Sequence, residues 1–81
     1  MSAPSEFAEL VSIELARARE KFPRFNSAHE GYAVILEEMD ELWALVVLKS
    51  TLRSREQMLE EATQIAAMAQ RFAEDIGLVK R

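Results

Sequence analysis

The 81-residue chain contains no cysteine, only two glycines and two prolines, and a single tryptophan and tyrosine. Without cysteine, disulfide bridges and thiolate-ligated zinc sites are both excluded, and a reducing compartment is compatible with the sequence. The scarcity of glycine and proline, and the absence of alternating valine, isoleucine and threonine, argue against a sheet. Because 49% of the residues are nonetheless hydrophobic, many of them alanine, we expect an all-α fold of helices packed on helices.

Long apolar segments and basic stripes are also lacking. The longest apolar run, 42–48, has seven residues, whereas a membrane span needs about 20, so we expect no membrane insertion. Residues 1–6 show no basic region followed by an apolar one, so we expect no secretory signal and a cytoplasmic location. The net charge of −4 disfavours binding to a nucleic acid polymer and instead suits a cation, or an anionic ligand bridged by a cation.

Three helices account for nearly all of the chain, at about residues 5–22, 28–49 and 54–76. Serine caps are available to each of them: Ser2 or Ser5, Ser27 and Ser54. Ser27 and Ser54 have the spacing of capping boxes, because Glu30 and Gln57 follow them three residues later. Pro23 ends the first helix, since proline disfavours helical geometry in the residue before it. Gly77 is suited to end the third helix.

These helices predict a single domain over residues 1–81, with the second and third helices forming an antiparallel hairpin. The second helix carries a main apolar stripe made of Tyr32, Ile35, Leu36, Met39, Leu42, Trp43 and Val46. A chain this short buries only about 60% of the surface that its unfolded form exposes, so self-association is an economical source of stability. We therefore expect two copies to pair into a four-helix core, as a homodimer or a dimer of dimers.

The second helix concentrates four carboxylates within one turn: Glu37, Glu38, Asp40 and Glu41. At 100° per residue, Glu37, Glu38 and Glu41 lie together on the side away from the main apolar stripe. That side also carries aliphatic residues one turn before and after the acids: Val34, Leu45 and Leu48. A merely solvated face would not place them there, so we expect the acids to be covered by a neighbouring helix. In an antiparallel hairpin, Glu61 of the third helix then faces them.

Clustered carboxylates away from water are costly unless a cation neutralises them. Acids at i, i+1 and i+4 on one helix, with one more from its neighbour, predict a set of oxygen ligands: Glu37, Glu38, Glu41 and Glu61. Mg²⁺ takes oxygen ligands, keeps several waters and commonly bridges to phosphates. We therefore expect a Mg²⁺ site, with Mn²⁺ as the alternative ion.

The string Glu37-Glu38-x-x-Glu41, followed by Glu61 near the start of the next helix, resembles the MazG-type all-α nucleoside triphosphate pyrophosphohydrolases. The similarity covers roughly residues 25–76, including the flanks 29–32 and 66–69. It implies Mg²⁺-dependent hydrolysis of a nucleoside triphosphate to the monophosphate and pyrophosphate, by helical dimers or dimers of dimers. By position, the resemblance makes the four glutamates metal ligands and makes Glu38 and Glu41 catalytic. The family aspartate of the second motif is replaced by Gln64, whose amide oxygen can ligate Mg²⁺ without charge.

Two other interpretations stay open. Gln64 motivates a degenerate homologue that binds a nucleotide or metal without turnover, and the acidic helix alone is compatible with a helical protein-interaction module. Basic residues follow the acidic helix: Lys49, Arg53 and Arg55. They are candidate contacts for the phosphates of a nucleotide substrate. The alternative is that they belong to a solvated loop and bind no ligand. Tyr32 and Trp43 are expected in the core or an interface rather than stacked on a base.

Overall fold

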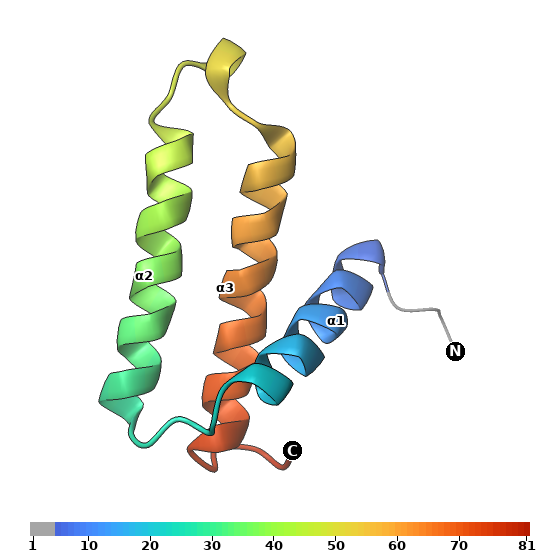
Figure 1. Ribbon diagram of the computed structural model, residues 1–81, viewed down its shortest axis with the longest axis vertical. Coiled ribbons are helices and arrows are strands. Elements are labelled where there is room, and N and C mark those ends of the chain that lie inside the picture. The colour runs from blue at the N-terminus through green and yellow to red at the C-terminus, as the bar shows by residue number, and fades with distance from the viewer. Residues whose placement is uncertain (1–4) are drawn as a thin grey trace.

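The computed structural model describes residues 5–81, which form three α-helices and one short 3₁₀ helix (Figure 1). The elements are α1 at Glu6–Lys21, α2 at Ala28–Val46, η1 at Ser50–Leu52 and α3 at Arg55–Asp75. Within the described range there is no strand, so the expected all-α class is confirmed. None of these helices combines the length and apolar character that crossing a membrane requires.

Each α-helix begins after a serine that satisfies one of its free backbone N–H groups. The hydroxyl accepts from the residue three positions on, at 3.0 to 3.1 Å: Ser5 from Ala8, Ser27 from Glu30 and Ser54 from Gln57. The capping serines of α2 and α3 are therefore those that the sequence predicts. Ser5 caps α1, and the other candidate, Ser2, lies outside the described residues.

The C-terminal end of α2 comes earlier than expected, at Val46 instead of residue 49. Arg53 explains the difference, because its Nε donates to the carbonyl oxygens of Val46 and Leu48, both at 3.0 Å. These carbonyls would otherwise lack partners at a helix end. The chain then turns through η1 into α3.

Gly77 ends α3 with a positive φ of 82°. The amide of Leu78 donates to the carbonyl of Ala73 at 2.8 Å, and the amide of Gly77 donates to the carbonyl of Glu74 at 3.2 Å. This pair of bonds is the Schellman motif, which favours glycine because a Cβ is disfavoured in left-handed backbone. The sequence-based expectation of a glycine stop is confirmed.

Replacing Gly77 by alanine is expected to lower the free energy of unfolding by about 1 kcal/mol, the cost of left-handed backbone for a residue with a Cβ. No atom lies within 4 Å of the position that this Cβ would take, so the cost is conformational and not steric. Urea unfolding measures it. Gly77→Asn is the control and should lose less, since asparagine tolerates this conformation better; equal stability of all three proteins would contradict the argument.

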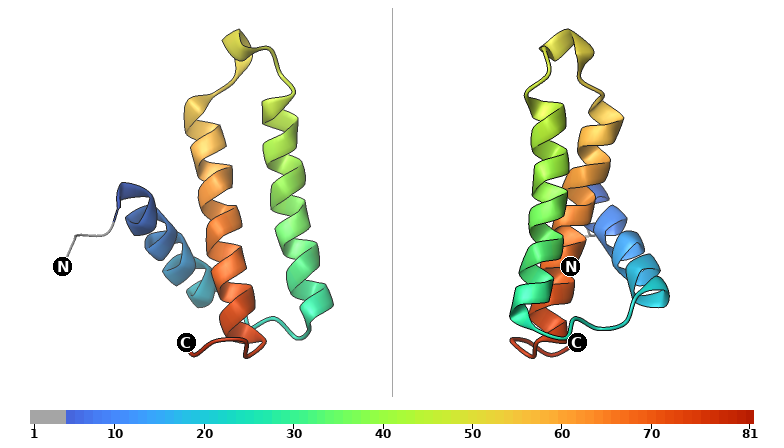
Figure 2. Two further views of the ribbon diagram at one scale, coloured as in Figure 1. Left: turned by 180° about the vertical axis from the view of Figure 1, so that it is seen from behind. Right: turned by 60° about the vertical axis from the view of Figure 1, so that its left-hand side comes forward.

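The helices α2 and α3 form the expected antiparallel hairpin, and α1 packs across the opposite side of α3 (Figures 1 and 2). In the described chain, α1 and α2 do not pack against each other. The central helix of the single chain is therefore α3, and α2 packs against the rest of the described chain on one side only. The core is small and lies around α3: Leu15, Ala18, Phe25, Ala67 and Met68.

The connector between α1 and α2 is held by the buried side chain of Arg71 on α3. Its Nη2 donates to the carbonyl of Pro23 at 2.6 Å, and its guanidinium lies 4.0 Å from the ring centroid of Phe25. Asp75 pairs with Arg71 at 3.5 Å and accepts from the Phe25 amide at 3.1 Å. A buried guanidinium needs such partners, because an unsatisfied buried charge is costly.

The main apolar stripe of α2 is divided by the packing. Ile35, Leu42 and Val46 are partly buried, whereas the remaining members are exposed: Tyr32, Leu36, Met39 and Trp43, here called the outer stripe. Trp43 is 65% exposed and Tyr32 is 62% exposed. Neither residue is in the core of the single chain, so the core alternative for this pair is wrong. Exposed apolar stripes of this kind are common at interaction surfaces.

Candidate metal centre

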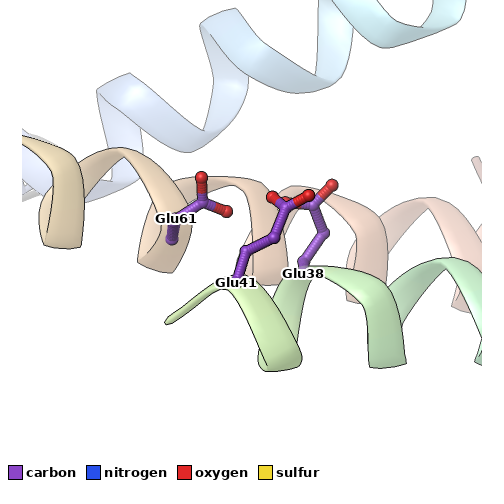
Figure 3. A group of neighbouring side chains, drawn as sticks. All are labelled: Glu38, Glu41 and Glu61. Atoms are coloured by element: carbon purple, nitrogen blue, oxygen red, sulfur yellow. The ribbon is translucent and has the colours of Figure 1, made fainter. Parts of the chain in front are cut away.

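Three glutamates from the two helices of the hairpin converge on one point. One carboxylate oxygen from each of Glu38, Glu41 and Glu61 lies within 4.8 Å of the other two. Figure 3 shows Glu38 and Glu41 side by side on α2, with their carboxylates next to each other, and Glu61 of α3 on the side of Glu41. The register of the antiparallel hairpin brings Glu61 opposite the acidic turn, as the sequence predicts.

The two sides of this cluster differ in exposure. Glu38 is half-buried on the face of α2 that packs against α3, in line with Val34, Ile35 and Leu42. Glu61 is also half-buried, whereas Glu41 is exposed. The expectation that a neighbouring helix covers the acids therefore holds for Glu38 and not for Glu37 or Glu41.

Burial raises the pKa of Glu38 to about 8, assisted by its hydrogen bond with Glu61 and by the charge of Glu41. Burial also raises the pKa of Glu61, and its contacts with Glu41 raise it further. At neutral pH the cluster without a cation therefore retains a proton that an exposed glutamate would have lost.

The donor set fits a hard divalent cation. All three groups offer carboxylate oxygens, and Oε2 of Glu61 is buried with no hydrogen-bond partner. Buried polar atoms are normally paired, so this oxygen is one that a cation would satisfy. Around one octahedral Mg²⁺ with Mg–O bonds of about 2.1 Å, ligand oxygens lie about 3.0 Å apart when adjacent and about 4.2 Å apart when opposite, so the three carboxylates would close inward on the ion.

Gln64 lies one turn after Glu61 and contacts Glu38. With its amide nitrogen turned toward Glu38, it donates to both carboxylate oxygens, at 3.1 and 2.6 Å. This orientation is chosen by the hydrogen-bond network. In this orientation Gln64 holds the Glu38 carboxylate in place, and the amide oxygen of Gln64 points away from that carboxylate.

A groove adjoins the carboxylate cluster. It lies between α1 and α2, over the surface of α3, and has a volume of about 450 Å³. Glu37 and Glu38 line its α2 side, and Val34, Met68 and Phe22 supply apolar surface. Glu37 is exposed and belongs to this groove; it is not one of the three glutamates whose oxygens converge.

Two cations on the α1 side of the groove were not among the candidates from sequence. Arg17 and Lys21 both line the groove. Arg17 is bound to Glu14 through Nε and Nη2 at 3.1 and 3.0 Å. Their spacing of four residues places them on one face of a helix, which is the signal that identifies them. Nothing local to α1 shows that this face lies across a groove from α2.

The basic residues that the sequence suggests for phosphate binding lie elsewhere. Lys49 and Arg53 belong to the connection between α2 and α3, Arg55 is the first residue of α3, and none of the three lines the groove. Arg53 is occupied in closing the end of α2. These three residues remain candidates only for a ligand that extends beyond the groove.

Compared with protein-family models, curated proteins and solved structures, the chain gives no match.

Proposed function

We propose that the protein is a Mg²⁺-dependent nucleoside triphosphate pyrophosphohydrolase of MazG-like type. The observation that carries the proposal is the convergence of Glu38, Glu41 and Glu61 from facing helices, with one buried oxygen left unpaired. The resemblance of the motif to the MazG-type enzymes supports it, because that resemblance assigns these same residues to the metal. Mn²⁺ is the alternative ion, since it shares the preference for carboxylate oxygen.

The groove beside the cluster provides space for a nucleotide. Its volume of about 450 Å³ falls within the range of roughly 300–1,000 Å³ typical of small-molecule sites. Val34, Met68 and Phe22 offer apolar contact to a base, while Arg17 and Lys21 offer charge to phosphates. A nucleotide lying along the groove would direct its phosphates toward Glu38.

A bound divalent ion supplies charge neutralisation at the phosphates and a more acidic water. Glu38 and Glu41 differ in what they offer to the reaction. Glu41 is exposed, so its carboxylate reaches solvent and is suited to orient the attacking water. Glu38 lies between the helices and is held by Gln64, so its carboxylate is fixed relative to those of Glu41 and Glu61.

We further propose that two copies pair through the outer stripe of α2. Tyr32, Leu36, Met39 and Trp43 recur at helical spacing and are all exposed in the single chain. The core of one chain is small, so burying this stripe against its copy adds apolar area where the fold is short of it. The pairing would build the four-helix core from two hairpins, as a dimer or as the unit of a tetramer.

Replacing Met39 at the centre of the outer stripe by glutamate is expected to shift the protein to monomer, because a buried unpaired carboxylate is costly. Sedimentation equilibrium over a concentration series measures the change, expected to be at least about tenfold in the dissociation constant. Ile13→Glu is the matched control, since Ile13 is exposed on α1 outside the stripe. A wild-type protein that stays monomeric throughout would refute the pairing.

Phosphorus NMR tests the activity directly. Wild-type protein is mixed with ribo- and deoxynucleoside triphosphates, with and without Mg²⁺. Monophosphate and pyrophosphate should appear only with the ion. Appearance of diphosphate and inorganic phosphate instead would contradict cleavage between the α and β phosphates.

The contact between Gln64 and Glu38 favours a second candidate, a homologue that binds metal or nucleotide without turnover. In this case Mg²⁺ would raise the melting temperature, because a ligand of the folded state stabilises it, while no product would form. Gln64→Asp would then be expected to restore turnover. A protein unaffected by Mg²⁺ in both assays would favour the interaction module.

A further inference from the structure

Four arginines meet at the end of the molecule opposite η1. Figure 2 shows that the connector after α1, the end of α3 and the C-terminal tail lie together there. Arg19, Arg24, Arg71 and Arg81 come from these segments and from α1, and all four line an open cavity of about 180 Å³. This cavity is here called the arginine cavity. It brings together cations that are far apart in the sequence.

The local carboxylates do not balance these charges. Arg19 pairs with Glu74, and Arg71 pairs with Asp75. Among residues 5–81, Arg24 and Arg81 have neither a salt bridge nor a side-chain hydrogen bond. Two of the four guanidinium groups therefore have no side-chain carboxylate partner in the described chain, and like charges held close together are unfavourable.

Arg19 supplies a second observation. Its Nε is buried and has no hydrogen-bond partner, although a buried donor without an acceptor costs free energy. Burial, followed by the charges of Arg81 and Arg24, lowers the pKa of the Arg19 guanidinium. Arg71, by contrast, is satisfied by Pro23 and stacked on Phe25, so it forms a fixed wall.

We propose that the arginine cavity binds a small oxyanion of the phosphate class, such as inorganic phosphate or pyrophosphate. Guanidinium groups match phosphate oxygens with paired donors and stay charged at all relevant pH values. The cavity volume of about 180 Å³ lies below the roughly 300 Å³ typical of sites for larger organic ligands, which favours an anion of this size. The bound anion would accept from Arg19 Nε and offset the unpaired charges of Arg24 and Arg81.

This site is separate from the carboxylate cluster. Arg71 lies ten residues after Glu61 on α3, which corresponds to about 15 Å along the helix axis. The arginine cavity contains no residue of the cluster. Binding there is therefore expected without any divalent ion, and the proposal stands whether or not the protein hydrolyses nucleotides.

Calorimetric titration with inorganic phosphate and, in parallel, pyrophosphate tests the proposal in the presence of a chelator and at constant ionic strength. One anion should bind per chain. The double variant Arg24→Gln/Arg81→Gln should weaken binding at least about tenfold, since it removes two charge-assisted contacts. Both residues are exposed, so the variant should fold normally, which far-UV circular dichroism checks.

Lys49→Gln/Arg55→Gln is the matched control, because both residues are exposed and lie at the opposite end of the helical hairpin. It removes the same two positive charges and should bind the anion like wild type. At ten times the dissociation constant, the anion should raise the melting temperature of wild type by roughly 5 to 10 °C. The Nε resonance of Arg19 should shift in the same titration.

Three outcomes would overturn the proposal. Wild-type protein showing no heat of binding and no rise in melting temperature would exclude the site. An equal loss in Lys49→Gln/Arg55→Gln would show general charge attraction. An unchanged affinity in the double variant would place the anion elsewhere, for example at Arg17 and Lys21 in the groove.

Discussion

Replacing Glu38 by glutamine is expected to reduce Mg²⁺-dependent turnover at least about a hundredfold, because it removes the central charged ligand while keeping the side-chain shape. Glu38 is the half-buried member of the cluster on α2 and lies beside both Glu41 and Glu61. The rise in melting temperature that Mg²⁺ produces should disappear in the same variant. Initial rates of pyrophosphate release, together with thermal unfolding, measure the two effects.

Asp40→Asn is the matched control for this variant. Asp40 is exposed, stands two residues away and takes no part in the convergence of oxygens. It removes the same negative charge from the acidic turn and should keep both activity and the response to Mg²⁺. Full turnover in Glu38→Gln would refute the assigned metal centre. An equal loss in Asp40→Asn would show that turnover depends on the total negative charge of the acidic turn and not on Glu38 itself.

Without divalent ions, the protein is expected to lose stability as the pH rises from 4.5 to about 8. The pKa of Glu38 is about 8 in the folded chain against 4.5 ordinarily. Between these values the folded state holds a proton that the unfolded state has released, so rising pH favours unfolding. The raised pKa of Glu61 acts in the same direction. Above about pH 8 the loss due to Glu38 is complete.

Each unit of pKa corresponds to about 1.4 kcal/mol, and partial exposure of Glu38 should reduce the full effect to about half, on the order of 2 kcal/mol. Urea unfolding across this pH window, with a chelator present, measures it. Glu38→Gln should flatten the pH dependence. Added Mg²⁺ should stabilise increasingly toward high pH, because metal binding requires deprotonated carboxylates. A chelated wild-type protein whose stability stays constant over the window would contradict the buried, protonated cluster.

Much of the fold follows from local chemistry. The serine caps, the proline after α1 and the glycine after α3 are each decided within a few residues of the chain. The meeting of Glu61 with Glu38 and Glu41 also follows, because a short connection forces α2 and α3 into an antiparallel pair. The placement of this part of the candidate site is therefore readable from sequence.

The place of α1 is not readable in the same way. Its few buried residues, Leu15 and Ala18, pack on α3 instead of α2, and this choice depends on contacts between distant segments. The groove cations Arg17 and Lys21 depend on it too, as does the arginine cavity. The outer stripe is the opposite case. The spacing of its apolar residues predicts one apolar face of the helix, but it does not show whether the surface that covers this face belongs to the same chain or to a second one.

The connector between α1 and α2, together with Arg71, separates the groove from the arginine cavity. Phe22, Pro23 and Arg71 line the groove beside the carboxylates, and the same three residues line the arginine cavity. Occupants of the two spaces would contact these same three residues, so we expect their binding free energies to be coupled. If one occupant changes the affinity for the other by some factor, the second occupant changes the affinity for the first by the same factor. A substitution of Arg71 alters both spaces together, whereas Arg24 and Arg81 report on one of them alone.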